Sequence, residues 1–367
     1  MRRSVLPLIA AALLAGTPEA RPAFRQEAGS DTTLHSGSIE RITYASGRFE
    51  IAGNLYLPAA AERPCPAVMW VSGSGPSSRE LRNPETRRVV NCFLDSGVAY
   101  FRVDKPGSGD SRGTVDDEST FVQLARIVVD GVRILRAHPA IDSGRIGLFG
   151  SSQAGYIMPI AITRSDGIAF MIGSSCPAEN SIEQWNYLLE QQLLCRRVPP
   201  EKAGEMAGMF ALLRSTPDSV QFARAIGYFD RNPMIVPSLG YDSSFSRKAR
   251  TWWPRTIDSA DESHFDPMTL VEKIAIPIYM AYGGRDTQID PFQGMEGYRA
   301  ACRRGGNQSP RTVLLPESDH NMHVSGGCLD EMASLRNRGV YRVDPEYLRT
   351  LRGWVGEVKR RLRAPGQ

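Results

Sequence analysis

The stretch RIGLFGSSQAGYIMPI, residues 145–160, decides the fold of this chain. It opens with a short apolar run that is typical of a buried parallel strand. A tight turn rich in small residues follows over 150–154, and residues 154–163 are apolar and compatible with a helix. We therefore predict that Ser152 lies on a sharp strand-to-helix turn with its hydroxyl pointing outward. The backbone N–H of Gln153 would then lie at a helix N-terminus, where it can stabilise a developing negative charge.

This stretch resembles the nucleophile elbow of α/β-hydrolases, G-x-S-x-G, with Ala154 in place of the second glycine and Gly155 directly after it. The resemblance implies that Ser152 is a catalytic nucleophile. A stricter match to the same pattern, GDSRG, centres on Ser111. There a loop separates the serine from the preceding strand, and no apolar helix follows at once. The context therefore favours Ser152 over Ser111.

The composition is that of a large globular protein. The chain has 367 residues, of which 41% are hydrophobic, so it can bury a large core. Its net charge of +4 is small for this length, and no block of Lys and Arg with interleaved aromatic residues is present. These features argue against a nucleic-acid partner.

The N-terminal residues resemble a targeting segment. Arg2 and Arg3 are followed by an apolar stretch over 5–16, which is short for a membrane-spanning helix. We predict a signal peptide over 1–23 and a flexible lead-in over 24–37. The expected protein is secreted or periplasmic, without stable membrane insertion after signal removal; an uncleaved anchor is the alternative.

Six cysteines are present, and none belongs to a C-x-x-C pair, so a zinc site is poorly supported. Export would permit disulfides. Cys176–Cys195 and Cys302–Cys328 are the pairs to test first, because each closes a modest loop. The alternative is that the cysteines are buried as small apolar residues.

Strand and helix patterns alternate over 38–177 and again over 266–367. This alternation predicts an α/β-hydrolase catalytic domain built on a mostly parallel, doubly wound sheet. An antiparallel hairpin is expected at its start. Active sites of such sheets lie at the carboxyl ends of the strands.

The alternation stops over 178–265, where we predict an inserted helical cap. Apolar residues recur at helical spacing over 181–197 and 201–215, and 241–264 is expected to be a loop. The Met, Trp and Phe residues of this segment could line an acyl pocket or form the core of the cap.

A Gly/Ser-rich loop, SGSGP, follows the apolar strand over 67–71. It resembles the H-G-S-G-P loop of the family, with Ser72 in the place of the histidine. The resemblance implies that the backbone N–H of Ser74 is the second oxyanion donor, beside that of Gln153. The alternative is a plain turn. Residues 104–113 resemble the family stretch D-x-x-G-x-G-x-S-x-G, in which Ser111 belongs to the scaffold.

The remaining catalytic residues are expected after late strands, in the order Ser, Asp, His. Asp286 lies in GGRD after an apolar strand, and His320 lies in ESDHN after the last strand. Asp290 and His323 are the alternatives. In this arrangement His320 accepts the proton of Ser152 and Asp286 orients the imidazole. The chemistry requires no metal ion and no organic cofactor.

These features predict an exported serine hydrolase that cleaves carboxylic esters. The chain resembles the esterases of the dienelactone-hydrolase and prolyl-oligopeptidase-like group, whose substrates are small esters or short peptides. A serine exopeptidase, with Glu183 or Glu190 binding the substrate amino terminus, and a thioesterase are alternatives. A catalytically dead binding protein is a more remote one. The sequence leaves the oligomeric state open.

Overall fold

A computed structural model describes residues 33–61, 63–113, 121–233, 236, 244–252, 264–308, 310–328 and 341–362. The predicted signal peptide lies outside these residues, as does most of the lead-in.

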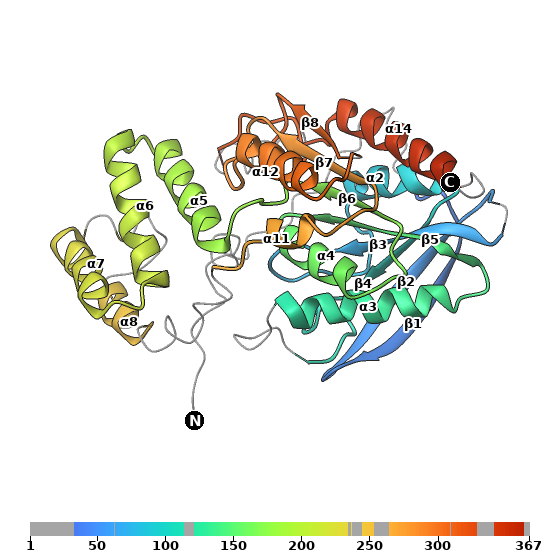
Figure 1. The fold of residues 1–367 in the computed structure, drawn as a ribbon, viewed down its shortest axis with the longest axis horizontal. Helices are drawn as coiled ribbons and strands as arrows, with labels where there is room; N and C mark the ends of the chain where they lie inside the picture. The colour runs from blue at the N-terminus through green and yellow to red at the C-terminus, as the bar shows by residue number, and fades with distance from the viewer. Residues whose placement is uncertain are drawn as a thin grey trace, which may run out of the picture.

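The fold is built on one eight-stranded sheet with the strand order β1-β2-β4-β3-β5-β6-β7-β8 (Figure 1). The strands β1 and β2 form an antiparallel hairpin, β2 pairs with β4 in the antiparallel sense, and every later pair is parallel. The predicted α/β-hydrolase fold is therefore confirmed. The strands are β1 (Ser36–Ser46), β2 (Phe49–Pro58), β3 (Cys65–Val71), β4 (Ala99–Val103), β5 (Ile141–Ser151), β6 (Phe170–Ser174), β7 (Ile278–Gly283) and β8 (Arg311–Leu315).

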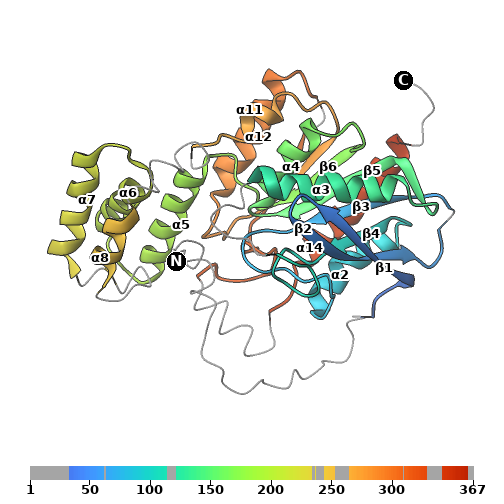
Figure 2. The ribbon, with the colours of Figure 1, turned by 90° about the horizontal axis from the view of Figure 1, so that it is seen from below.

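Helices cover both faces of the sheet. In Figure 2, α3, α4, α11 and α12 lie on one side of the strands, and α2 and α14 lie on the other. Two separate clusters of buried apolar side chains correspond to these two faces. The helices are α2 (Pro84–Leu94), α3 (Phe121–Arg136), α4 (Ala154–Thr163), α11 (Met268–Val271), α12 (Pro291–Arg304) and α14 (Pro345–Arg361).

Local sequence signals explain where several of these helices begin. Asn83 precedes α2 and its side chain accepts a hydrogen bond from the backbone N–H of Glu85. Asp344 does the same for the N–H of Glu346 at the start of α14. Each cap is followed by a proline in the first turn, where a missing N–H is harmless.

The parallel strands place the predicted site at one edge of the sheet. From β3 the chain passes first to β4 on one side and then to β5 on the other, so the winding changes direction beside β3. The carboxyl ends of parallel strands flank the ligand crevice at such a point. The segments that follow β3, β5, β7 and β8 carry Ser74, Ser152, Asp286 and His320.

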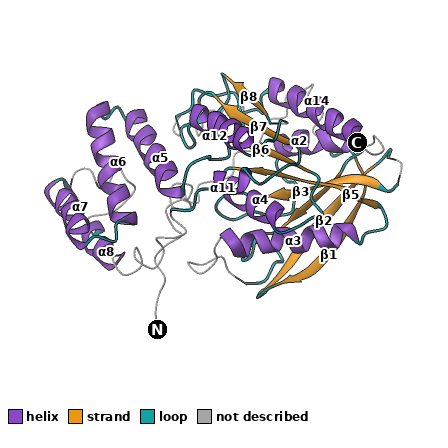
Figure 3. Cartoon of the chain, in the orientation of Figure 1, coloured by secondary structure: helices purple, strands orange, loops and turns teal. Residues whose placement is uncertain are grey.

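A group of helices lies between β6 and β7 in the chain and stands beside the sheet (Figure 3). Its members are α5 (Ser181–Cys195), α6 (Pro200–Ser215), α7 (Ser219–Arg231), α8 (Phe245–Ala249) and the 3-10 turn η2 (Arg250–Trp252). These helices share an apolar core of their own, in which Met206 and Phe210 are buried. Both side chains therefore contribute to the core of the helical segment.

One part of the cap differs from the prediction. The helix α8 lies within 241–264, where a loop was expected. Phe245 and Ala249 are one turn apart and fully buried, so this short segment has an apolar face that the local composition hides. The ring of Phe245 contacts those of Phe210 and Phe229, with centroids 6.3 and 5.0 Å away. Packing on α6 and α7 stabilises a helix that is too short to form alone.

Candidate active site

Ser152 lies on a strained turn between β5 and α4. Its φ angle is +57°, in the left-handed region that a residue with a Cβ rarely adopts. Gly150 makes the turn possible, because a Cβ there would lie 2.5 Å from the Cβ of Ala154 and 2.8 Å from the carbonyl oxygen of Val71. The N–H of Ser152 donates to the carbonyl of Ser174 at the end of β6, 3.1 Å away. The local structure is thus that of a nucleophile elbow.

The departure from the elbow pattern has a simple explanation. Ala154 is completely buried, so its methyl group fits where the pattern has glycine. The close approach occurs one residue later, at Gly155. A Cβ on Gly155 would lie 2.8 Å from the Cβ of Cys176 and 2.9 Å from the Cδ of Pro177. The requirement for a glycine has moved by one position along the helix.

Ser111 has a structural role. Its Oγ is buried, donates to the carbonyl of Asp104 at 2.8 Å and accepts the N–H of Ala52 at 2.9 Å. This hydroxyl therefore joins β2 to the loop that follows β4. Such a bridge leaves it unsuited to nucleophilic attack.

Asp286 and His320 form a buried pair. The Nδ1 atom of His320 lies 2.9 Å from Oδ2 and 3.1 Å from Oδ1 of Asp286. The carboxylate also accepts the backbone N–H groups of Gln288 and Ile289, at 2.8 and 3.0 Å. Burial by itself lowers the pKa of His320, but the charge of Asp286 and its hydrogen bond outweigh this and raise the pKa above 6.5. The geometry is that of a carboxylate that orients a general base.

The alternative residues have other contacts. Asp290 caps α12, where its carboxylate accepts the N–H groups of Phe292 and Gln293. The ring of His323 stacks on Tyr341 with centroids 3.8 Å apart. Neither belongs to the Asp286–His320 pair.

The loop after β3 lies against the elbow. A Cβ on Gly73 would be 3.2 Å from the Cβ of Ser152 and 3.1 Å from the carbonyl oxygen of Ser151. Ser74 is exposed, and Gln153 is the N-cap residue of α4.

No hydrogen bond joins the Ser152 hydroxyl to His320 within the described residues. Such bonds are often long in enzymes without substrate, and they shorten when the substrate binds.

Two titratable side chains that follow strands of the sheet, Lys105 and Glu179, were not identified from the sequence. Lys105, just after β4, is buried, and burial lowers its pKa to about 8. Glu179, shortly after β6, is buried, and burial raises its pKa to about 7, with the charges of Asp290 and Glu183 adding to the effect. One oxygen of Glu179 accepts the N–H of Ala178, and the other has no partner among the described residues. Only their position after predicted strands could have indicated them.

The helix α5 is fastened to the turn that carries Asp286. The hydroxyl of Tyr187 donates to the carbonyl of Asp286 at 3.0 Å, and the amide of Gln184 donates to the carbonyl of Gln288 at 2.9 Å. The cap therefore contacts the backbone of the predicted acid directly. Glu183 and Glu190, the predicted acids for a substrate amine, lie on the same helix.

A disulfide joins Cys195 to Cys328, so the predicted pairs Cys176–Cys195 and Cys302–Cys328 are wrong. Cys176 follows β6, and Cys302 lies on the buried face of α12; both are free and fully buried. Loop length favoured pairs that are near in sequence. The tertiary fold instead brings the end of α5 to the segment that follows His320.

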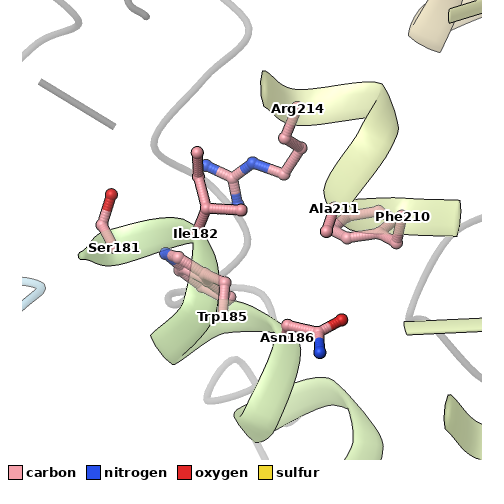
Figure 4. A pocket seen from close by; sticks show the side chains of 7 residues that line it. All are labelled: Ser181, Ile182, Trp185, Asn186, Phe210, Ala211 and Arg214. Carbon is pink, nitrogen blue, oxygen red and sulfur yellow. The ribbon is translucent and has the colours of Figure 1, made fainter. Parts of the chain in front are cut away.

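A small pocket lies between α5 and α6 (Figure 4). The guanidinium of Arg214 lies 5.0 Å from the ring centroid of Trp185 on its wall. The residues that line this pocket are Ser181, Ile182, Trp185, Asn186, Phe210, Ala211 and Arg214. None of the predicted catalytic residues lines it.

Two negative findings apply to the described part of the chain. It holds no cluster of His, Cys, Asp and Glu side chains with the arrangement of a metal site. It also holds no helix with the length and apolar character needed to cross a bilayer.

This fold and site define the class: the protein is a serine hydrolase with an α/β-hydrolase fold. Its sequence matches the X-Pro dipeptidyl-peptidase (S15) family over residues 47–320, more than half of the chain. The chain therefore belongs to the S15 peptidase family. No protein with a curated description matches it in sequence.

Solved structures with the same fold include esterases and peptidases. An esterase of Pyrococcus furiosus has a TM-score of 0.54 and 13% identity, and the match covers 95% of this chain and 100% of the esterase. An acylaminoacyl peptidase of Pyrococcus horikoshii has a TM-score of 0.52 and 15% identity, over 90% of this chain. The chain spans only 42% of the length of that peptidase and 36% of a Porphyromonas gingivalis dipeptidyl peptidase 4 (TM-score 0.48, 14% identity, 86% of this chain).

Proposed function

We propose that this protein is an exported hydrolase of carboxylic esters that acts through Ser152, His320 and Asp286. The observation that carries the proposal is the buried pair of His320 with Asp286, at 2.9 and 3.1 Å, together with a serine on a left-handed elbow turn. These residues follow β5, β7 and β8, and the carboxyl ends of parallel strands lie at one edge of a sheet, which supports the proposal.

In the proposed mechanism, Nε2 of His320 accepts the proton of Ser152 as its Oγ attacks the ester carbonyl. Asp286 holds Nδ1 and stabilises the imidazolium that forms. The N–H groups of Ser74 and Gln153 stabilise the oxyanion, each by about 3 kcal/mol. His320 then protonates the leaving alkoxide. Water attacks the acyl-enzyme in the same way and releases the acid.

Two considerations favour esters over peptides. Ester cleavage requires only the predicted triad and the oxyanion donors, whereas an exopeptidase must also bind the charged amino terminus of its substrate. In addition, the match covers 100% of the Pyrococcus furiosus esterase but only 42% of the Pyrococcus horikoshii acylaminoacyl peptidase.

The second candidate is a serine exopeptidase. Membership of the S15 family supports it, and so does Glu179, a buried acid near the carboxyl end of β6 that could bind an ammonium group. A thioesterase uses the same chemistry on a better leaving group.

Export is proposed from the apolar N-terminal stretch. The disulfide between Cys195 and Cys328 supports it, because such bonds persist in oxidising compartments. Mass spectrometry of protein purified from the culture medium or periplasm should give a mature N-terminus near residue 24. A full-length chain retained in the cytoplasm would contradict this proposal.

The activity test compares p-nitrophenyl acetate and butyrate with aminoacyl-p-nitroanilides. The proposal expects ester turnover that Ser152→Ala abolishes, and a fluorophosphonate probe that labels Ser152 alone. Faster cleavage of the anilides would favour the exopeptidase. Absence of both reactions and of labelling would favour a catalytically dead binding protein.

A further inference from the structure

The ammonium group of Lys105 lies between the two segments that carry the proposed oxyanion donors. Its Nζ donates to the carbonyl oxygen of Gly73 and to the side-chain Oε1 of Gln153, both at 3.0 Å. Gly73 belongs to the loop after β3, and Gln153 belongs to the elbow. One cation thus joins two segments that are 80 residues apart in the chain (153 minus 73).

This lysine is unusual in its surroundings. It is only 7% exposed, and among the described residues it makes no ion pair with a carboxylate. The neighbouring carboxylate, Asp104, pairs with Arg79 instead. A buried lysine without a carboxylate destabilises a fold unless its hydrogen bonds compensate. The ammonium group of Lys105 has only two neutral oxygens as acceptors. We therefore expect this lysine to have a role other than stabilising the fold.

Hydrogen bonds hold the backbone at Lys105 and the side chain of the preceding Asp104. The N–H of Lys105 donates to the carbonyl of Ser77 at 2.9 Å, so the residue contacts both ends of the loop after β3. Asp104 accepts the N–H groups of Arg79 and Asp110, at 2.6 and 2.9 Å. The backbone from which the Lys105 side chain extends is therefore held in place by these hydrogen bonds.

The Gly73 carbonyl belongs to the same peptide unit as the Ser74 N–H. In a planar trans peptide the C=O and N–H bonds point in opposite directions, and the only cis peptide bond in the described residues is Arg63–Pro64. When Lys105 holds the carbonyl on its side, the N–H of Ser74 must point away from it. A Cβ on Gly73 would lie 3.2 Å from the Cβ of Ser152, so this peptide unit lies beside the predicted nucleophile.

We propose that Lys105 is a positioning residue of the oxyanion hole, which fixes the Gly73–Ser74 peptide and the Gln153 side chain with one ammonium group. The bond to Gly73 orients the Ser74 N–H, and a cation on an amide oxygen also polarises the amide, which strengthens its N–H as a donor. Preorganised donors of this kind act mainly on the transition state. This inference rests on the proposed esterase function and deepens it.

The test uses Lys105→Met, which keeps the side-chain length and removes the charge and the donors. Lys105→Arg keeps the charge, and Lys202→Met, at a partly exposed cap lysine that pairs with Glu205, is the control for the substitution itself. The kcat and KM for p-nitrophenyl butyrate are measured together with the Tm. The affinity for an alkyl boronic acid, whose serine adduct places an oxygen in the oxyanion hole, is measured alongside.

We expect Lys105→Met to lower kcat about 100-fold, the effect of losing one oxyanion donor, and to weaken boronate binding by a similar factor. The KM should change less than about threefold, since ground-state binding does not use the oxyanion hole. Lys105→Arg should recover part of the kcat, and Lys202→Met should match the wild type. A purely structural lysine would lower the Tm and leave kcat and boronate affinity of the folded fraction unchanged, and this result would overturn the proposal.

If Lys105→Met does not fold, Gln153→Leu decides the question, because it removes one acceptor of the ammonium and keeps the backbone N–H. A lower kcat at constant KM supports the proposal, and an unchanged kcat overturns it. Wild-type protein that hydrolyses no ester and resists the fluorophosphonate contradicts the esterase function, and with it the role of Lys105. Active wild type with an equally active Lys105→Met variant contradicts the role of Lys105 alone.

Discussion

Cys195, the last residue of α5, is bonded to Cys328, which lies 133 residues further along the chain and eight residues after His320. The segment before Cys328 also contacts the turn of the predicted acid. The guanidinium of Arg285 donates to the carbonyl of Ser325 at 2.8 Å, and the hydroxyl of Thr287 donates to that of Gly327 at 3.1 Å. The disulfide therefore ties the cap to the segments that carry both Asp286 and His320.

We expect the double variant Cys195→Ser/Cys328→Ser to unfold at lower urea concentration, with a loss of up to about 5 kcal/mol for a cross-link that spans 133 residues. The four other cysteines are buried thiols, so native protein should react slowly with a thiol reagent, and unfolded protein should reveal four thiols. Dithiothreitol should destabilise the wild type and leave the double variant unchanged. Equal stability of the two proteins would mean that the bond does not form.

Ser111 and Ser152 are a matched pair of serines with opposite expected behaviour. Ser152→Ala should remove ester hydrolysis and retain stability, because the Ser152 hydroxyl makes no hydrogen bond to another described residue. Ser111→Ala should retain most of the kcat and destabilise the protein by about 1–3 kcal/mol, because it leaves the buried N–H of Ala52 without a partner. Activity assays and urea unfolding of both variants separate these outcomes. The reverse pattern would make Ser111 the nucleophile.

Asp286 and Asp290 provide a second comparison. Asp286→Asn should reduce kcat by about 10⁴-fold, since an amide favours the wrong tautomer of His320. Asp290→Asn should keep its kcat and stability, because asparagine caps α12 as well as aspartate does. Steady-state kinetics on one ester substrate is sufficient. If Asp290→Asn is the inactive variant, the acid has been misassigned.

The pH dependence should reflect His320. Its pKa is raised above 6.5, so kcat/KM should fall as the pH falls through that higher value, where the imidazole is protonated and cannot act as a base. His323→Gln should keep this acid limb, whereas Asp286→Asn should move it to lower pH.

The same raised pKa has the opposite effect on stability. The charged His320–Asp286 pair contributes fully below pH 6.5, the ordinary pKa of histidine, and its contribution is lost as the pH rises through the folded-state pKa of His320. The free energy of unfolding contributed by this pair should therefore decrease over the pH range in which activity rises. Urea titrations of the wild type and His320→Gln between pH 6 and 8 measure the difference. A difference that is constant with pH would contradict the assignment.

Much of this protein could be predicted from local patterns. The elbow at Ser152 combines an apolar strand, a turn of small residues and an apolar helix, and each is a property of a few consecutive residues. Asp286 and His320 could be selected because they follow late strands in the expected order. The eight-stranded sheet follows from the same alternation of strands and helices.

Other features were decided only by the tertiary structure. The partner of Cys195, the burial of Lys105 between Gly73 and Gln153, and the buried acid Glu179 were not visible in the sequence. Each depends on which segments meet after the sheet has formed and the cap has docked. Hydrophobic periodicity determines which face of a helix or strand is buried. Contacts between distant segments depend on how all the elements pack together, so they could not be predicted from local sequence patterns.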